Sequence, residues 1–254
     1  MTQTIALAGK GGVGKTTITG LLINYLAARH QGPVLAVDAD ANSNLNEVLN
    51  VEVGTTLGEI REEMEKAGQS SEIPAGMTKA DYADMKFADA LVEGDDFDLL
   101  VMGRTQGKGC YCFVNGILTT QVAKYARNYR YVVVDNEAGM EHISRGILPK
   151  VDTVILVSDA SMRGVQAAGR IHELVKSLKL GEKEMKLLVN RAPNGEITDA
   201  VRRQIADFGM ELAGVLPADE TVTEFDGDGR PTSELPADNA FRRALYAALD
   251  TIQF

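Results

Sequence analysis

The residues with the clearest chemistry lie near the start of the chain, in the run Gly9-Lys10-Gly11-Gly12-Val13-Gly14-Lys15-Thr16-Thr17. The run has the spacing G-x-x-x-x-G-K-[ST], which is typical of a phosphate-binding loop between a strand and a helix. Its glycines allow successive backbone N–H groups to turn toward one anion, and the amino end of the following helix adds about half a positive charge. We therefore expect Lys15 to reach the β- and γ-phosphates of a nucleotide such as ATP, Thr16 to bind Mg²⁺, and Thr17 to contact the α-phosphate.

Acidic residues follow two other apolar runs. Val34–Val37 is followed by Asp38 and Asp40, and Tyr131–Val134 is followed by Asp135. Ligands of open α/β sheets bind at the carboxyl ends of the strands, so these carboxylates are expected beside the phosphate loop. We expect Asp135 to hold Mg²⁺ through a water molecule, together with Thr16. Aspartate after a strand is also a common turn former, which leaves a purely structural role open for Asp38 and Asp40.

The chain has two cysteines, and they lie one residue apart, as Cys110 and Cys112. A tetrahedral thiolate site needs four ligands, so one chain cannot complete such a site from this pair. Two copies related by a two-fold axis would supply four sulfurs. The alternative is that both are ordinary reduced cysteines. Two thiolates do not distinguish Ni²⁺ from Zn²⁺, because both metals bind sulfur.

Short apolar runs alternate with helical patterns along residues 1–254, with no linker between domains. Continuous runs such as VVVD and TVILV indicate strands that are covered on both faces, as in parallel sheets. We expect one α/β domain, a doubly wound, mainly parallel sheet of about seven strands with helices on both faces. The expected strands are Ile5–Ala8, Val34–Val37, Leu99–Met102, Tyr131–Val134, Thr153–Val157, Lys186–Val189 and Leu212–Leu216. The expected helices are Thr16–Arg29, Leu57–Lys66, Gly116–Asn128, Arg163–Leu178, Ile197–Phe208 and Asn239–Ile252, with a weaker one near Tyr82–Leu91, and the expected surface loops are Gln69–Met77 and Thr223–Pro236.

The composition excludes several kinds of partner. The chain has 26 Lys and Arg against 36 Asp and Glu, a net charge of −10. Nucleic-acid binding needs a basic surface, so we expect no nucleic-acid partner. The sequence lacks an apolar run long enough to span a membrane and lacks a secretory signal, so we expect no membrane partner and a cytoplasmic protein.

Lys10 is the unusual residue of the phosphate loop. With it the loop resembles the deviant Walker A motif K-G-G-x-G-K-[ST] of the family that includes the nitrogenase iron protein and the septum-positioning (MinD) and chromosome-partitioning ATPases. The resemblance implies a homodimer in which Lys10 reaches the nucleotide of the other subunit. It also implies that Asp40 activates the attacking water with support from Asp38. An asparagine at the position of Asn190, here followed by Arg191, would bind the adenine amino group, and Pro217 would pack on the base.

Two further strings narrow the resemblance. Gly107-Lys108-Gly109-Cys110-Tyr111-Cys112 and Ala138-Gly139-Met140-Glu141-His142-Ile143-Ser144-Arg145-Gly146 resemble those of the CooC family, the nickel-associated maturation ATPases of carbon monoxide dehydrogenase. The resemblance implies a homodimeric MgATPase that binds Ni²⁺ or Zn²⁺ at the dimer interface through Cys110 and Cys112. Its client would be carbon monoxide dehydrogenase or acetyl-CoA synthase.

Two other functions fit the phosphate loop. A positioning ATPase would need a basic amphipathic helix or a basic surface, whereas Asn239–Ile252 carries only Arg242 and Arg243 as bases, opposed by Asp250. An iron-sulfur reductase resembling the nitrogenase iron protein would also use two cysteines per subunit, but far apart in the chain rather than as C-x-C.

Overall fold

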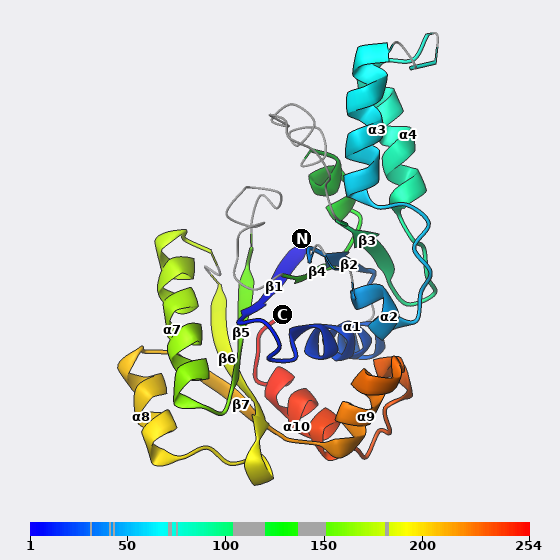
Figure 1. The fold of residues 1–254 in the computed structure, drawn as a ribbon. Coiled ribbons are helices and arrows are strands. Elements are labelled where there is room, and N and C mark those ends of the chain that lie inside the picture. The colour runs from blue at the N-terminus through cyan, green and yellow to red at the C-terminus, as the bar shows by residue number, and fades with distance from the viewer. Residues whose placement is uncertain are drawn as a thin grey trace.

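A parallel β-sheet runs through the middle of the protein (Figure 1). The computed structural model describes residues 1–30, 32–40, 42, 44–70, 73–74, 76–103, 120–136, 151–180 and 183–254. Within them the sheet has seven strands in the order β3-β2-β4-β1-β5-β6-β7, all parallel. The strands are β1 (Gln3–Gly9), β2 (Val34–Asp38), β3 (Asp98–Val101), β4 (Tyr131–Asp135), β5 (Thr153–Asp159), β6 (Glu184–Ala192) and β7 (Leu212–Pro217). The predicted α/β class and the seven predicted strands are confirmed.

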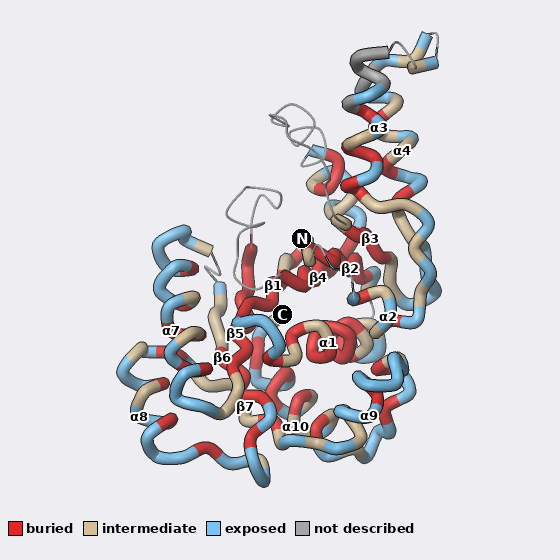
Figure 2. Tube along the Cα trace, viewed as in Figure 1, coloured by how far each residue is buried: buried red, intermediate tan, exposed pale blue. Residues whose placement is uncertain are grey.

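The central strand β1 is covered on both faces, because its side chains alternate between two apolar clusters. Ile5 and Leu7 belong to the cluster that includes residues of α1 (Lys15–His30) and α10 (Ala240–Leu249), whereas Ala6 and Ala8 belong to the cluster that includes residues of α7 (Met162–Ser177) and α8 (Asp199–Asp207). The strands β1, β2, β4 and β5 are almost wholly buried, whereas the outward faces of the helices are exposed (Figure 2). This two-sided covering explains why the strand sequences are continuously apolar.

Two helices, α3 (Leu57–Ser70) and α4 (Lys79–Ala90), pack against each other beyond the edge strand β3 (Figure 1). They confirm the helix expected over Leu57–Lys66 and the weaker one near Tyr82–Leu91. The expected loop Gln69–Met77 is wrong at Gln69 and Ser70, which belong to α3, and its residues 71, 72 and 75 lie outside the described residues. The helix expected over Gly116–Asn128 is present at 120–126, and its first residues also lie outside the described part.

The expected loop Thr223–Pro236 is wrong in its first half, because helix α9 spans Glu220–Asp228. Asp219 caps its amino end by accepting a hydrogen bond from Val222 N, and Gly229 ends it at φ +66°. Phe225 is buried on its inner face. The Asp-Gly-Asp-Gly run therefore contains a helix end rather than a loop, and the cap and the buried ring offset the cost of a glycine inside the helix.

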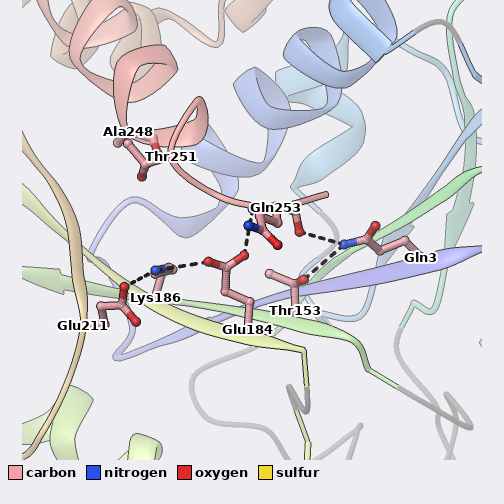
Figure 3. A network of polar contacts seen from close by, with 8 residues as sticks. All are labelled: Gln3, Thr153, Glu184, Lys186, Glu211, Ala248, Thr251 and Gln253. Atoms are coloured by element: carbon pink, nitrogen blue, oxygen red, sulfur yellow. Dashed lines mark hydrogen bonds and ion pairs between the residues drawn. The ribbon is translucent and has the colours of Figure 1, made fainter.

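The amino and carboxyl segments of the chain meet beside the starts of the central strands (Figure 3). Gln3 Nε2 donates to Thr153 Oγ1 at 3.3 Å and to the carbonyl oxygen of Gln253 at 3.2 Å. Gln253 N donates to Glu184 Oε2 at 2.7 Å, and Glu184 pairs with Lys186. These contacts fasten the segment after α10 to β1, β5 and β6. No helix of the described residues is both long and apolar enough to cross a membrane.

Candidate nucleotide-binding site

The phosphate loop lies at the carboxyl edge of the sheet, between the end of β1 at Gly9 and the start of α1 at Lys15. Three glycines fix its shape. A Cβ at Gly9 would lie 2.3 Å from the carbonyl oxygen of Val157 on β5, so β1 and β5 approach too closely there for a side chain. Gly12 and Gly14 have φ of +76° and +90°, a backbone region that favours glycine. A Cβ at Gly14 would also lie 2.5 Å from Asn190 Nδ2.

Thr16 and Asp135 meet as the sequence predicts. Thr16 Oγ1 donates to Asp135 Oδ2 at 2.6 Å, although 119 positions separate the two residues. Burial raises the pKa of Asp135 to about 6, while the hydrogen bond from Thr16 and the charge of Lys15 act in the opposite direction. A carboxylate and a hydroxyl held together in this way are the hard oxygen donors that Mg²⁺ prefers. The pair therefore fits a magnesium site.

Lys15 lies folded over its own loop. It is 8% exposed, and its Nζ donates to the carbonyl oxygen of Lys10 at 3.3 Å. Lys10 itself is exposed. The loop thus presents one lysine inside the site and a second at its surface, which is the arrangement needed if Lys10 acts on a neighbouring subunit.

Asp38 and Asp40 have different surroundings. Asp38 is fully buried at the end of β2, opposite Asp135 of β4, and its carboxylate accepts hydrogen bonds from Asp40 N and Leu45 N, both at 3.0 Å. Burial raises the pKa of Asp38 to about 7, against the lowering effect of these two bonds. Asp40 is partly exposed and accepts from Asn42 N at 2.8 Å. Asp38 therefore shapes the loop that carries Asp40, and Asp40 is the one nearer to solvent.

The residues expected at the base lie together on the other side of the loop. Asn190 is 3% exposed at the end of β6, and its Nδ2 donates to Val13 O at 2.8 Å. Arg191 donates from Nη1 to Gly12 O at 3.0 Å. Both line a cavity of about 110 Å³ with Gly14, Thr17 and Pro217, and residues of α9 and α10 complete its wall. The cavity adjoins the phosphate loop, as a base pocket must.

Two polar contacts of this site were not anticipated from the sequence. Thr19 Oγ1 lies within hydrogen-bond distance of Asp135 Oδ1, at 3.2 Å, and of the carbonyl oxygen of Lys15, at 2.9 Å, so α1 contacts both oxygens of the Asp135 carboxylate. Thr17 Oγ1 donates to Asp226 Oδ1 on α9 at 3.1 Å. Thr19 lies one helical turn after Thr16, and this spacing could have revealed it. The sequence carries no comparable signal for Asp226.

The cysteine pair Cys110 and Cys112 lies outside the described residues, as does the string Ala138–Gly146. Among the residues that the structure does describe, no group of three or more His, Cys, Asp or Glu side chains could hold a metal ion.

Comparison with known proteins identifies the family. Residues 4–232 match the CobQ/CobB/MinD/ParA nucleotide binding domain, CbiA. The chain belongs to this family. With its phosphate loop and the Thr16–Asp135 pair, it is a P-loop ATPase of the CbiA family.

Two curated proteins are similar in sequence to this chain over most of its length. An uncharacterized ATP-binding protein of Methanocaldococcus jannaschii is 44% identical over 235 residues, covering 92% of this chain and 92% of the relative. The carbon monoxide dehydrogenase accessory protein CooC of Rhodospirillum rubrum is 29% identical over 258 residues, covering 96% of this chain and 95% of the relative.

Solved structures confirm the fold. The cell division ATPase MinD of Pyrococcus furiosus matches with a TM-score of 0.72 at 20% identity, over 98% of each chain. A ParA family ATPase of Chlorobium tepidum matches with a TM-score of 0.70 at 18% identity, also over 98% of each chain. At these identities the likeness concerns the fold.

Proposed function

We propose that this chain is an ATP-hydrolysing metal-insertion factor that works in the cytoplasm as a homodimer. Its cargo would be Ni²⁺ and its client carbon monoxide dehydrogenase or acetyl-CoA synthase. The observation that carries the ATPase part is the 2.6 Å contact between Thr16 and Asp135, which joins the phosphate loop to the end of β4. The client part is supported by the CooC protein of Rhodospirillum rubrum, which is similar over nearly the full length of both chains.

In this proposal each residue of the loop has one task. Lys15 and the backbone N–H groups of residues 9–14 bind the β- and γ-phosphates, and Thr17 binds the α-phosphate. Thr16 and Asp135 hold Mg²⁺, which when bound would neutralise negative charge on the phosphates. Asp40 orients the attacking water on a loop that Asp38 fixes through Asp40 N and Leu45 N.

Lys10 would act across the dimer. Its exposed position allows it to reach the nucleotide of a second subunit, where its charge would stabilise the transition state. Hydrolysis would then depend on dimer formation, since neither subunit alone presents both lysines to one nucleotide. Asn190, Arg191 and Pro217 would bind the base in the adjoining cavity.

Cys110 and Cys112 would supply two thiolates from each subunit. Four thiolates are enough for one metal ion per dimer, and Zn²⁺ competes strongly with Ni²⁺ for such ligands. The metal site and the trans-acting lysine both require two subunits, so metal binding and ATP binding would each favour the dimer.

The test combines metal stoichiometry with molecular mass. Purified protein is titrated with Ni²⁺ under reducing, anaerobic conditions, with and without a non-hydrolysable ATP analogue, and its mass is measured by light scattering. We expect one Ni²⁺ per dimer and more dimer with the analogue. The double variant Cys110→Ser/Cys112→Ser should lose Ni²⁺ binding, whereas Tyr111→Phe, which keeps both thiols, should retain it.

Three results would contradict the proposal. Undiminished Ni²⁺ affinity in the cysteine variant would refute the interface site. A broad brown absorption band after reconstitution with iron and sulfide would favour an iron-sulfur reductase. ATP-dependent binding to lipid vesicles or DNA, without metal binding, would favour a positioning ATPase of the MinD or ParA kind.

A further inference from the structure

The cavity beside the phosphate loop contains two carboxylates, Asp219 and Asp226, which have different freedom to bind a ligand. Each carboxylate oxygen of Asp219 accepts a hydrogen bond from the protein: Oδ1 from Val222 N at 3.1 Å and Oδ2 from Asn239 Nδ2 at 2.9 Å. Asp226 accepts one hydrogen bond, from Thr17 Oγ1 at 3.1 Å. Within the described part of the chain, both oxygens of Asp219 thus hold protein donors, whereas Asp226 uses Oδ1 alone and keeps Oδ2 for a further donor.

The donor that Asp226 uses is one that a nucleotide would claim. In the proposed function the hydroxyl of Thr17 binds the α-phosphate, and it then ceases to donate to Asp226. A carboxylate cannot replace this lost bond with a phosphate oxygen, because both are negatively charged acceptors. It needs hydroxyl or N–H donors at the place next to the α-phosphate.

In the proposed function adenine packs against Asn190, Arg191 and Pro217, so it is not the donor next to the α-phosphate. Asn190, Arg191 and Pro217 form the part of the cavity wall that comes from the ends of β6 and β7, whereas Asp226 comes from α9 and lies beside Thr17. The part of a nucleotide between the α-phosphate and the base is the sugar. A ribose presents two adjacent hydroxyl groups, and a carboxylate can accept hydrogen bonds from both, as acidic residues do in dinucleotide sites of other α/β folds.

We propose that Asp226 binds the ribose hydroxyl groups and makes this site selective for ribonucleotides over deoxyribonucleotides. The proposal rests on the proposed ATP site, and it adds α9 to the elements that bind the nucleotide. Selectivity follows because a site built to accept hydrogen bonds from a hydroxyl rejects an analogue that lacks it. Thr17 donates one hydrogen bond to Asp226, and the sugar hydroxyl groups would replace this donor.

Equilibrium binding with Mg²⁺ tests the inference. Affinities for ATP, 2′-deoxy-ATP and 3′-deoxy-ATP are measured by calorimetry for the wild type and for Asp226→Ala, Asp226→Asn and Asp228→Ala. We expect the wild type to bind each deoxynucleotide about 10-fold more weakly than ATP, as loss of one hydrogen bond to a charged group predicts. Asp226→Ala should bind all three alike, and Asp226→Asn should keep part of the preference because it keeps one acceptor oxygen.

Asp228→Ala is the matched control, because it removes a carboxylate of the same helix that does not line the cavity. It should preserve the wild-type preference. The inference is overturned if Asp226→Ala still discriminates between the sugars, or if the wild type binds ATP and both analogues equally. A wild type that binds none of the three nucleotides would instead refute the proposed ATP site, and the inference with it.

Discussion

Replacing Gly14 by alanine should damage the site through two separable effects. The residue has φ of +90°, and left-handed backbone costs an L-residue about 1–2 kcal/mol. The new Cβ would also lie 2.5 Å from Asn190 Nδ2, which must move and release Val13 O. Loss of a buried hydrogen bond of this kind costs about 1–3 kcal/mol. We expect Gly14→Ala to lower the free energy of unfolding by about 2–5 kcal/mol in total.

Gly12 provides the matched control for this substitution. Its φ is +76°, but a Cβ there would meet nothing within 4 Å, so Gly12→Ala carries the backbone cost without the collision. The difference between the two variants should be about 1–3 kcal/mol. In an Asn190→Ala background, Gly14→Ala should cost only as much as Gly12→Ala does, since the colliding amide is absent.

Urea denaturation at fixed pH measures these free energies, and equal slopes across the variants would show that the unfolded states are comparable. The same proteins should be titrated with ATP, because the collision displaces Asn190 from the cavity wall. Equal destabilisation by Gly12→Ala and Gly14→Ala would refute the argument, and so would a cost of Gly14→Ala that is unchanged when Asn190 is removed.

Three further substitutions test single contacts. Lys15→Ala should abolish ATP hydrolysis with an unchanged circular dichroism spectrum, and undiminished turnover would contradict the assignment of the loop. Asp38→Asn should flatten the pH dependence of stability: burial raises the pKa of Asp38 from 3.8 to about 7, so the stability that its protonated form contributes is full below pH 3.8 and is lost as the pH rises through about 7. Unfolding free energies measured from pH 4 to 8 should therefore fall more in the wild type, and parallel curves would be the contrary result. Asp219→Ala should destabilise the protein by about 1–2 kcal/mol in urea, because α9 loses its cap, whereas Glu220→Ala, on the same helix and exposed, should change stability little.

The sheet and the phosphate loop could be predicted from the sequence because their signals are local. Continuous apolar runs predict the seven strands. Polar residues at the ends of these runs predict that the nucleotide site lies at the carboxyl edge of the sheet. Asp135 and Thr16 could be paired without coordinates, because strand ends of a parallel sheet share one edge. The geometry of the site thus follows from topology and one motif.

The features that were missed depend on tertiary contacts. The sequence indicates a loop from Thr223 onward, where α9 continues, because the glycines give no sign of the cap at Asp219 or of the burial of Phe225. The sequence does not predict the short helix α2 (Leu45–Leu49), because five residues give too little helical periodicity. Its first residue is held by a distant contact, in which Leu45 N donates to the carboxylate of Asp38. The contact of Thr17 with Asp226 joins residues 209 positions apart, for which no spacing rule exists.

The central place of β1 has a consequence for how the protein is made. Gln3 pairs with Tyr131 and Ile5 pairs with Thr153, so both neighbours of the first strand are encoded far downstream. During translation the strand and its glycine loop leave the ribosome while these neighbours are still unmade, and pairing between such distant segments forms slowly. A nascent chain that stops before β5 lacks the strand against which Gly9 of the phosphate loop packs. Strand β1 is therefore completed only after β4 and β5 have been made, and until then its apolar side chains are exposed to chaperones and to other chains.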